Sequence, residues 1–408
     1  MLKKLLNRFH SAPPAPPPAA ATAAALGADP PVAAGLAPPP SPEALHRADA
    51  LVTEGNALED AGELGQAEAR YREAVATAPG HARTHLNLGI VLAARDDSDG
   101  AAAAYERVLA IDPRHPYGHY NYARLVFLRG DASRAASLLA VALQARPEFP
   151  HALILQAEVL DALGQPAQAA ESLQAALRLD PSNAGAWFNL ARICLRMDSV
   201  EGAEDAVRRA LDIEPDNPAA LELLVLVLRQ QGFAAEALVP LRRLIAQNPA
   251  SWPHRSLELL LMNFDDGVSA DALFRRHVEF GTDLERAVPA RFDQWRERGD
   301  GSRRLRVGYL SADFVMHPVT LFLVPVLGHH DRAQVEVFCY SFGARRDPIT
   351  ERVRALSDHW REVAALSDTQ VADAIHADGI DVLVDLIEHT DQPRLDVFCQ
   401  RPAPVQVR

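Results

Sequence analysis

Small apolar residues and prolines recur every 34 residues between positions 48 and 251 of the chain. One row consists of alanines, at Ala67, Ala101, Ala135, Ala169, Ala203 and Ala237. A second row consists of prolines, at Pro79, Pro113, Pro147, Pro181, Pro215 and Pro249. A third row contains Gly55, Gly89, Ala123, Ala157 and Ala191, and Val225 departs from it. Three rows in phase over six units indicate an internal repeat.

Apolar spacing within each unit predicts two antiparallel helices. In residues 150–183 the first helix is marked by Leu153, Leu155, Ala157 and Leu160, and the second by Ala169, Leu173, Ala176 and Leu177. Gly164 and Pro166 mark the turn, and Pro181 stops the second helix because the residue before a proline avoids the α region. This period is typical of the tetratricopeptide repeat. Within region 43–251 we expect six repeats, at 48–81, 82–115, 116–149, 150–183, 184–217 and 218–251.

Stacked repeats leave a concave groove lined by the first helix of each unit. The sixth position of that helix is asparagine in three units, at Asn87, Asn121 and Asn189. A carboxamide both donates and accepts, so this row predicts binding to the main chain of an extended peptide. The alternative is that each asparagine is satisfied by a neighbouring helix. Because such arrays typically bind proteins, we expect protein or peptide partners along the groove.

Beyond residue 302 the periodicity changes to short β-rich runs separated by helical segments. Strands are predicted at 305–310, 335–340 and 381–386. This alternation predicts a parallel sheet covered on both faces, a Rossmann-like α/β lobe over 303–408. Residues 252–302 are predicted to cap the repeats and connect them to this lobe. No G-x-G-x-x-G fingerprint for a dinucleotide is present.

Two loops of the predicted lobe carry candidate side chains. Open parallel sheets bind ligands outside the carboxyl ends of their strands. The loop after the first strand ends in His317 and Pro318, and the loop after residue 386 contains His389 and Thr390. Imidazole titrates near neutrality, so His317 is a candidate general base or hydrogen-bond donor, held in place by the rigid Pro318. No spacing of His, Cys or carboxylate residues predicts a metal site.

The first 42 residues are not expected to join the core. Residues 1–10 place Leu2, Leu5, Leu6 and Phe9 on one face, which predicts a short amphipathic helix. The alternative there is a frayed terminus. Residues 11–42 hold eleven of the 30 prolines and predict a disordered linker.

Composition narrows the class of protein. The formal net charge is −13, whereas nucleic-acid binding needs clustered Lys and Arg, so no nucleic-acid partner is expected. The odd, widely spaced cysteines Cys194, Cys339 and Cys399 favour reduced thiols of a cytoplasmic protein. No apolar run reaches the roughly 18 residues that span a bilayer.

Several stretches of the lobe carry a family resemblance. They are residues 305–314 (LRVGYLSADF) with His317 and Pro318, then residues 335–340, 378–386 and 401–406. Together with the preceding repeats they resemble bacterial-type protein O-linked N-acetylglucosamine transferases. The resemblance implies metal-free transfer of N-acetylglucosamine from UDP-N-acetylglucosamine to Ser or Thr of proteins that the repeats recruit. It implies no cofactor and a two-lobed GT-B architecture.

The same resemblance assigns roles to the two loops. His317 matches the histidine near the donor sugar, often proposed as the base, and Pro318 follows it. His389 and Thr390 match a second catalytic loop. Ile387 and Glu388 stand where the family carries a small or polar residue and then glycine, and a carboxylate repels a diphosphate. A different sugar nucleotide therefore stays open as the donor.

The family continues into a second lobe that contributes most contacts to UDP, including a lysine. This chain ends at Arg408, so we expect the 408-residue chain to be inactive by itself. We expect it to bind a UDP-sugar only if the second lobe is present. The alternative function is a non-catalytic repeat scaffold with a remnant transferase lobe.

Overall fold

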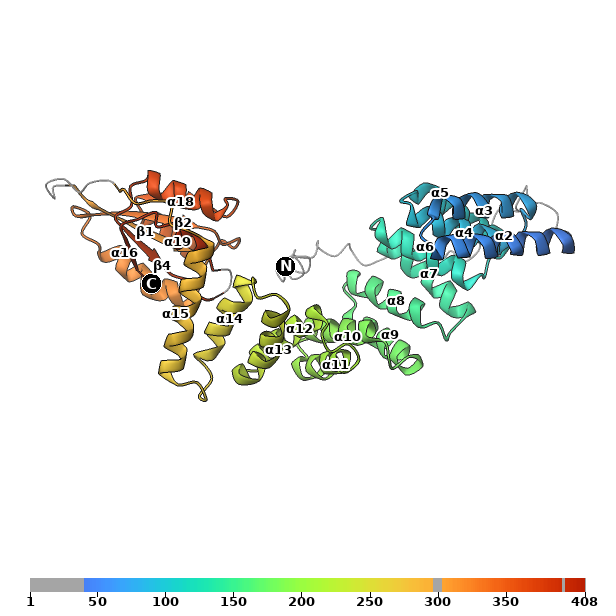
Figure 1. The fold of residues 1–408 in the computed structure, drawn as a ribbon, viewed down its shortest axis with the longest axis horizontal. Coiled ribbons are helices and arrows are strands. Elements are labelled where there is room, and N and C mark those ends of the chain that lie inside the picture. The colour runs from blue at the N-terminus through green and yellow to red at the C-terminus, as the bar shows by residue number, and fades with distance from the viewer. Residues whose placement is uncertain (1–39, 296–302, 391–392, 408) are drawn as a thin grey trace, which may run out of the picture. The chain divides into compact units, whose positions relative to one another are not determined.

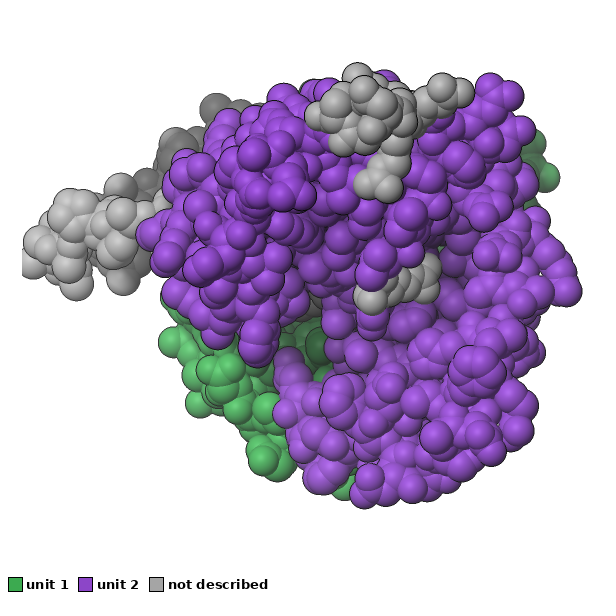
Figure 2. All heavy atoms as spheres, turned by 90° about the vertical axis from the view of Figure 1, so that its left-hand side faces the viewer, with its two compact units in different colours: residues 1–227 green, residues 228–408 purple. Residues whose placement is uncertain are grey.

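The computed structural model describes residues 40–295, 303–390 and 393–407. The chain divides into two compact units, Met1–Val227 and Leu228–Arg408, coloured separately in Figure 2. The boundary falls within helix α12 (Pro218–Gln230). The predicted helix at 1–10 and nearly all of the predicted linker at 11–42 lie outside the described residues.

The first unit is an array of antiparallel helix pairs (Figure 1). Before α12, its helices are α2 (Pro42–Asp60), α3 (Leu64–Thr77), α4 (Ala82–Ala94), α5 (Ser98–Ile111), α6 (Pro116–Leu128), α7 (Ala132–Ala145), α8 (Pro150–Ala162), α9 (Pro166–Leu179), α10 (Ala184–Arg196) and α11 (Val200–Ile213). The predicted repeat array is therefore confirmed. Each second helix ends directly before a cap residue, and the recurring proline follows, as in Thr77, Ala78 and Pro79.

Two helices of a repeat approach most closely where the third row of small residues lies. A Cβ atom added to Gly89 would lie 2.5 Å from Cε1 of Tyr105, and one added to Gly55 would overlap Tyr71 in the same way. In the next three repeats the small residue is alanine, and the opposite positions are Leu139, Leu173 and Val207. Glycine therefore occurs where the opposing side chain is a tyrosine, because only glycine leaves room for the ring.

A further row with the same 34-residue period lies in the turn between the helices of each repeat. Its members have positive φ: Gly62 (78°), Asp96 (63°), Gly130 (89°), Gly164 (76°), Asp198 (56°) and Gly232 (82°). Glycine adopts this left-handed conformation without strain, and aspartate tolerates it better than most residues. Only Gly164 was recognised as a turn residue from the sequence.

The second unit begins with helices and ends in a parallel sheet. Its first helices are α13 (Ala234–Gln247), α14 (Trp252–Met262) and α15 (Ala270–Ala287). The strands are β1 (Leu305–Ser311), β2 (Val335–Ser341), β3 (His359–Glu362), β4 (Val382–Asp385) and β5 (Val405–Val407), in the order β3-β2-β1-β4-β5. All four strand pairs are parallel. The predicted Rossmann-like lobe is confirmed.

Helices cover both faces of this sheet. Buried residues of α16 (Pro318–His329) and α17 (Pro348–Ala355) pack on one face with Val307 and Cys339. Those of α18 (Asp368–Ala377) and α19 (Leu395–Cys399) pack on the other face with Tyr340. Cys339 is fully buried in this core, and its burial raises the pKa of the thiol to about 12. Strand β3 was not predicted, because its sequence HWRE is short and polar.

Candidate functional site

The two predicted loops leave the sheet at its topological switch point. The chain runs from β1 outward to β3 and then returns to β4, so β1 and β4 are neighbours whose connections leave on opposite faces. Leu310 pairs with Asp385, and the N–H of Leu386 donates to the carbonyl of Leu310 at 3.3 Å. The loops that follow these residues therefore begin side by side, at the position where open α/β sheets bind ligands.

His317 is the N-cap of α16. Its Nδ1 accepts the backbone N–H of Val319 at 3.3 Å, and the backbone N–H of His317 donates to Oγ1 of Thr320 at 3.3 Å. These two hydrogen bonds form a capping box. Pro318 occupies the first turn, where its missing N–H costs nothing. Because Nδ1 accepts a hydrogen bond in this geometry, a neutral imidazole at this position carries its proton on Nε2. His317 therefore presents an N–H donor at the half-buried start of the helix.

Residues after β2 hold the loop that carries His317. Oδ2 of Asp347 accepts the N–H of Met316 at 2.6 Å, and Oδ1 caps α17 by accepting from Ile349 at 2.9 Å. The hydrogen bond from Met316 is the main reason that the pKa of Asp347 lies below its ordinary value. On the other side of the loop, a Cβ added to Gly343 would overlap the carbonyl oxygen of Ala312. Neither contact was predicted from the sequence.

The second loop turns at Glu388. This residue has φ of +52°, the left-handed region in which glycine is favoured. Oδ1 of Asp385 accepts the N–H groups of Ile387 at 3.0 Å and Glu388 at 3.2 Å and so stabilises the turn. Oγ1 of Thr390 donates to the carbonyl of Ile387 at 2.6 Å. The glutamate side chain is exposed beside the switch point.

His389 faces the helices that precede the sheet. Its Nδ1 lies 2.8 Å from Oγ of the buried Ser256 in α14, within hydrogen-bonding distance. Its ring is 5.2 Å from that of His277 and 5.5 Å from that of Phe280, both in α15. The sequence placed His389 in a ligand-binding loop but did not indicate these contacts, because they join segments more than 100 residues apart.

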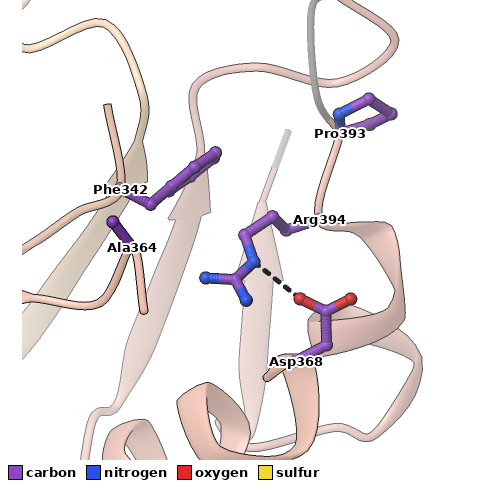
Figure 3. Close-up of a pocket in the computed structure, with 5 residues that line it drawn as sticks. All are labelled: Phe342, Ala364, Asp368, Pro393 and Arg394. Carbon is purple, nitrogen blue, oxygen red and sulfur yellow. Dashed lines mark hydrogen bonds and ion pairs between the residues drawn. The ribbon is translucent and has the colours of Figure 1, made fainter. Parts of the chain in front are cut away.

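A pocket of about 300 Å³ opens at the same edge of the sheet, after strands β2 and β3. Phe342, Ala364, Asp368, Pro393 and Arg394 line it (Figure 3). Nε of Arg394 donates to Oδ1 of Asp368 at 2.6 Å, the dashed line in Figure 3. This pocket was not predicted from the sequence. Its residues come from three separate loops and form no motif.

The predicted asparagine row lies along the repeat array, and each amide nitrogen has a partner. Nδ2 of Asn87 donates to the carbonyl of Arg83 and Nδ2 of Asn121 to that of Tyr117, both at 2.9 Å. Nδ2 of Asn189 lies 3.4 Å from Oε1 of Glu158 in the preceding repeat. The first two bonds lie within the asparagine's own helix, and only the third joins neighbouring helices, so the alternative of satisfaction by a neighbouring helix agrees with the geometry at Asn189 alone.

In residues 40–295, 303–390 and 393–407, no three His, Cys, Asp or Glu side chains converge as metal ligands. Over the same part of the chain, every helix is too short or too polar to cross a membrane.

Family models match both parts of the chain. Residues 247–408 match the model of Glycosyl transferase family 41. Residues 52–116 and 154–218 match one tetratricopeptide repeat model, and residues 92–159 match another.

Related proteins resemble a part of this chain. The probable UDP-N-acetylglucosamine–peptide N-acetylglucosaminyltransferase SPINDLY of Arabidopsis thaliana is 33% identical over 153 residues, which are 36% of this chain and 17% of that protein. The probable enzyme of the same description called SEC, also from Arabidopsis thaliana, is 38% identical over 112 residues, 27% of this chain and 12% of that protein. The matched stretch is thus a small part of these relatives' length.

Among solved structures, a mutant O-GlcNAc transferase of Thermobaculum terrenum is 28% identical to this chain. The match covers 71% of this chain and 49% of that chain, with a TM-score of 0.38. The chain therefore joins stretches similar to tetratricopeptide repeats to a stretch similar to glycosyl transferase family 41.

Proposed function

We propose that this chain is the repeat region and first catalytic lobe of a protein O-N-acetylglucosaminyltransferase. The reaction would move N-acetylglucosamine from UDP-N-acetylglucosamine to a Ser or Thr hydroxyl of a protein. The main observation in favour of this proposal is the position of His317, which caps α16 at the switch point between β1 and β4. The family 41 match over residues 247–408 and the names of the two plant relatives, both probable N-acetylglucosaminyltransferases, support this reaction class.

In this proposal His317 acts as a hydrogen-bond donor. Its Nδ1 lone pair is used by the N–H of Val319, so the proton that faces a ligand is on Nε2. A donor aimed at an oxygen that gains negative charge stabilises the transition state, here an oxygen of the donor sugar or its phosphate. This geometry favours the donor role over the general-base role, because a base would need the lone pair that the helix cap occupies.

The second loop would border the same ligand. We assign donor or substrate contacts to Pro318, His389 and Thr390, with His389 fixed by Ser256. The exposed carboxylate of Glu388 repels a diphosphate, so we place neutral sugar or acceptor hydroxyls near this lobe and the diphosphate farther away. In this scheme the described residues act without a metal or a cofactor.

The repeats would recruit the acceptor protein. Tetratricopeptide repeats typically bind proteins, and the groove side chains Asn87, Asn121 and Asn189 would contact an extended segment. The carboxamide oxygens of Asn87 and Asn121 would accept main-chain N–H groups, since their amide nitrogens already donate within their own helices. Oδ1 of Asn189 already accepts from Nη1 of Arg192 at 3.4 Å. We place the reaction in the cytoplasm, where thiols such as the buried Cys339 stay reduced.

The test uses the protein purified from its own source, labelled UDP-N-acetylglucosamine, and a hexosaminidase-treated extract of the same cells as acceptor mixture. We expect labelled sugar to become attached to protein and to be released from it by alkaline β-elimination, because the sugar is linked to Ser or Thr. UDP-glucose and UDP-N-acetylgalactosamine serve as competing donors. Capture of partner proteins without transfer from any of the three donors would overturn the proposal in favour of a scaffold.

A further inference from the structure

The pocket beside Arg394 is polar and carries a balanced pair of charges. The guanidinium of Arg394 uses three of its five N–H groups: Nε on Asp368, Nη1 on the carbonyl of Val363 at 3.0 Å, and Nη2 on the carbonyl of Leu366. One N–H on each Nη remains. Oδ2 of Asp368 has no hydrogen-bond partner within the described ranges of the chain. The pocket thus offers donors and an acceptor side by side.

Charge excludes ionic ligands from this pocket. Asp368 lines it together with Arg394, so an anion that approaches the guanidinium also meets a carboxylate. A cation that approaches Asp368 likewise meets the guanidinium. A neutral group avoids both repulsions and still finds hydrogen-bond partners of both kinds. The carboxamide of asparagine or glutamine has this composition, with two N–H donors and one carbonyl acceptor.

The pocket wall and its position agree with a flat side chain on a polypeptide. Phe342 provides an apolar wall, and its ring centroid lies 5.4 Å from Cζ of Arg394. Phe342 follows β2 and Ala364 follows β3, which is two strands from β1. Strands lie about 4.8 Å apart, so β3 is about 10 Å from β1. An extended chain covers that distance in about three residues.

We propose that this pocket binds an Asn or Gln side chain of the acceptor protein, about three residues from the Ser or Thr that receives the sugar. The assignment to an acceptor rests on the proposed function, whereas the preference for a carboxamide rests on the pocket alone. The two parts are therefore tested by separate readouts.

The binding test uses saturation-transfer NMR on the 408-residue chain with three small probes of similar size: propionamide, propionate and propylammonium. We expect propionamide to bind at least about tenfold more tightly than either ion, a difference of about 1.4 kcal/mol. Ala364→Leu fills the pocket from an exposed position and should abolish the signal. Ala365→Leu, at the exposed neighbouring residue outside the pocket lining, should leave it unchanged.

A charge change gives an independent check. Asp368→Asn removes the negative charge and leaves Arg394 unneutralised, so the preference should shift from propionamide to propionate. Equal binding of all three probes, or full propionamide binding by Ala364→Leu, would overturn the carboxamide pocket whether or not the protein transfers sugar.

The acceptor test uses peptides with one Ser and either Gln, Glu or Lys three residues away on one side. Displacement of propionamide by the Gln peptide alone supports the proposal. N-Acetylglucosamine also carries an amide, and displacement by this sugar but not by the Gln peptide would overturn the acceptor assignment. Neither readout requires transfer, so failure of the proposed function is recognised separately.

Discussion

The backbone N–H of Met316 donates to Oδ2 of Asp347 at 2.6 Å, and this bond ties the residue before His317 to the start of α17. The carboxylate also caps α17 through Ile349 and Thr350, so the position of the His317 loop depends on the neighbouring β2 connection. Asp347 therefore links the loop that carries the candidate donor to the start of α17.

The hydrogen bond between Met316 and Asp347 should depend on pH. The hydrogen bond from Met316 lowers the pKa of Asp347 in the folded protein below its ordinary value of about 3.9. This hydrogen bond is therefore fully formed above the ordinary pKa and is lost as pH falls through the lower pKa that Asp347 has in the folded protein. The amide resonance of Met316 in an NMR titration should move over that acidic range. In Asp347→Ala the same resonance should lack this transition, and an unchanged titration would contradict the assignment.

Gly343→Ala should displace the same loop from the other side. The added Cβ would overlap the backbone oxygen of Ala312, which cannot rotate away as a side chain could. We expect a loss of about 1–3 kcal/mol in the free energy of unfolding, the usual range for overpacking. Gly328→Ala in α16 is the matched control, because nothing lies within 4 Å of its added Cβ. Equal stability of the two variants in denaturant titrations would rule out the close approach.

Gly89→Ala tests the packing of the second repeat. The new Cβ would lie 2.5 Å from Tyr105, and we expect a loss of about 1–3 kcal/mol. The double variant Gly89→Ala, Tyr105→Leu recreates the Ala and Leu pair found in the third repeat and should recover part of that loss. A double variant less stable than both single variants in thermal melts would refute the coupling.

The left-handed turn row predicts opposite effects at two positions. Asp198→Gly should raise stability by about 0.5–1 kcal/mol, because aspartate at φ of 56° carries strain that glycine relieves. Gly130→Ala should lower stability by about 1–2 kcal/mol, since φ there is 89°. Thermal melts of both variants suffice, and changes of the same sign would be inconsistent with the turn geometry.

Glu388→Gly should favour binding of the sugar nucleotide. Glycine adopts φ of +52° without strain and removes a carboxylate from the switch point. We expect tighter binding of UDP-N-acetylglucosamine in calorimetry with the protein purified from its own source, and a weaker response to salt. Unchanged affinity would mean that the charge of Glu388 does not repel the diphosphate.

The repeat array could be predicted because its physics is local and periodic. Each proline, alanine and glycine row reports one packing constraint repeated every 34 residues. Three of the five strands, β1, β2 and β4, were visible as β-rich runs, whereas the short strands β3 and β5 were not predicted. The row of turn residues with positive φ has the same 34-residue period. Asp96 and Asp198 replace glycine in two of the repeats, so the row was not recognised from the sequence.

The site was only partly predictable. Position at a strand's carboxyl end identified His317 and His389, since loop placement follows from parallel topology. Three other features depend on contacts between distant segments: the hydrogen bond to Asp347, the packing of His389 on Ser256 and the pocket at Arg394. No spacing along a single sequence encodes such contacts, so they required the three-dimensional structure.

The most direct test of the account is the transfer rate of His317→Ala in the protein purified from its own source, with UDP-N-acetylglucosamine as donor. His329→Ala, at the exposed far end of α16, is the control. We expect a loss of about 10²-fold or more for His317→Ala, the range for removing one preorganised donor, and no change for His329→Ala. Equal rates for the two variants would contradict the central role of His317.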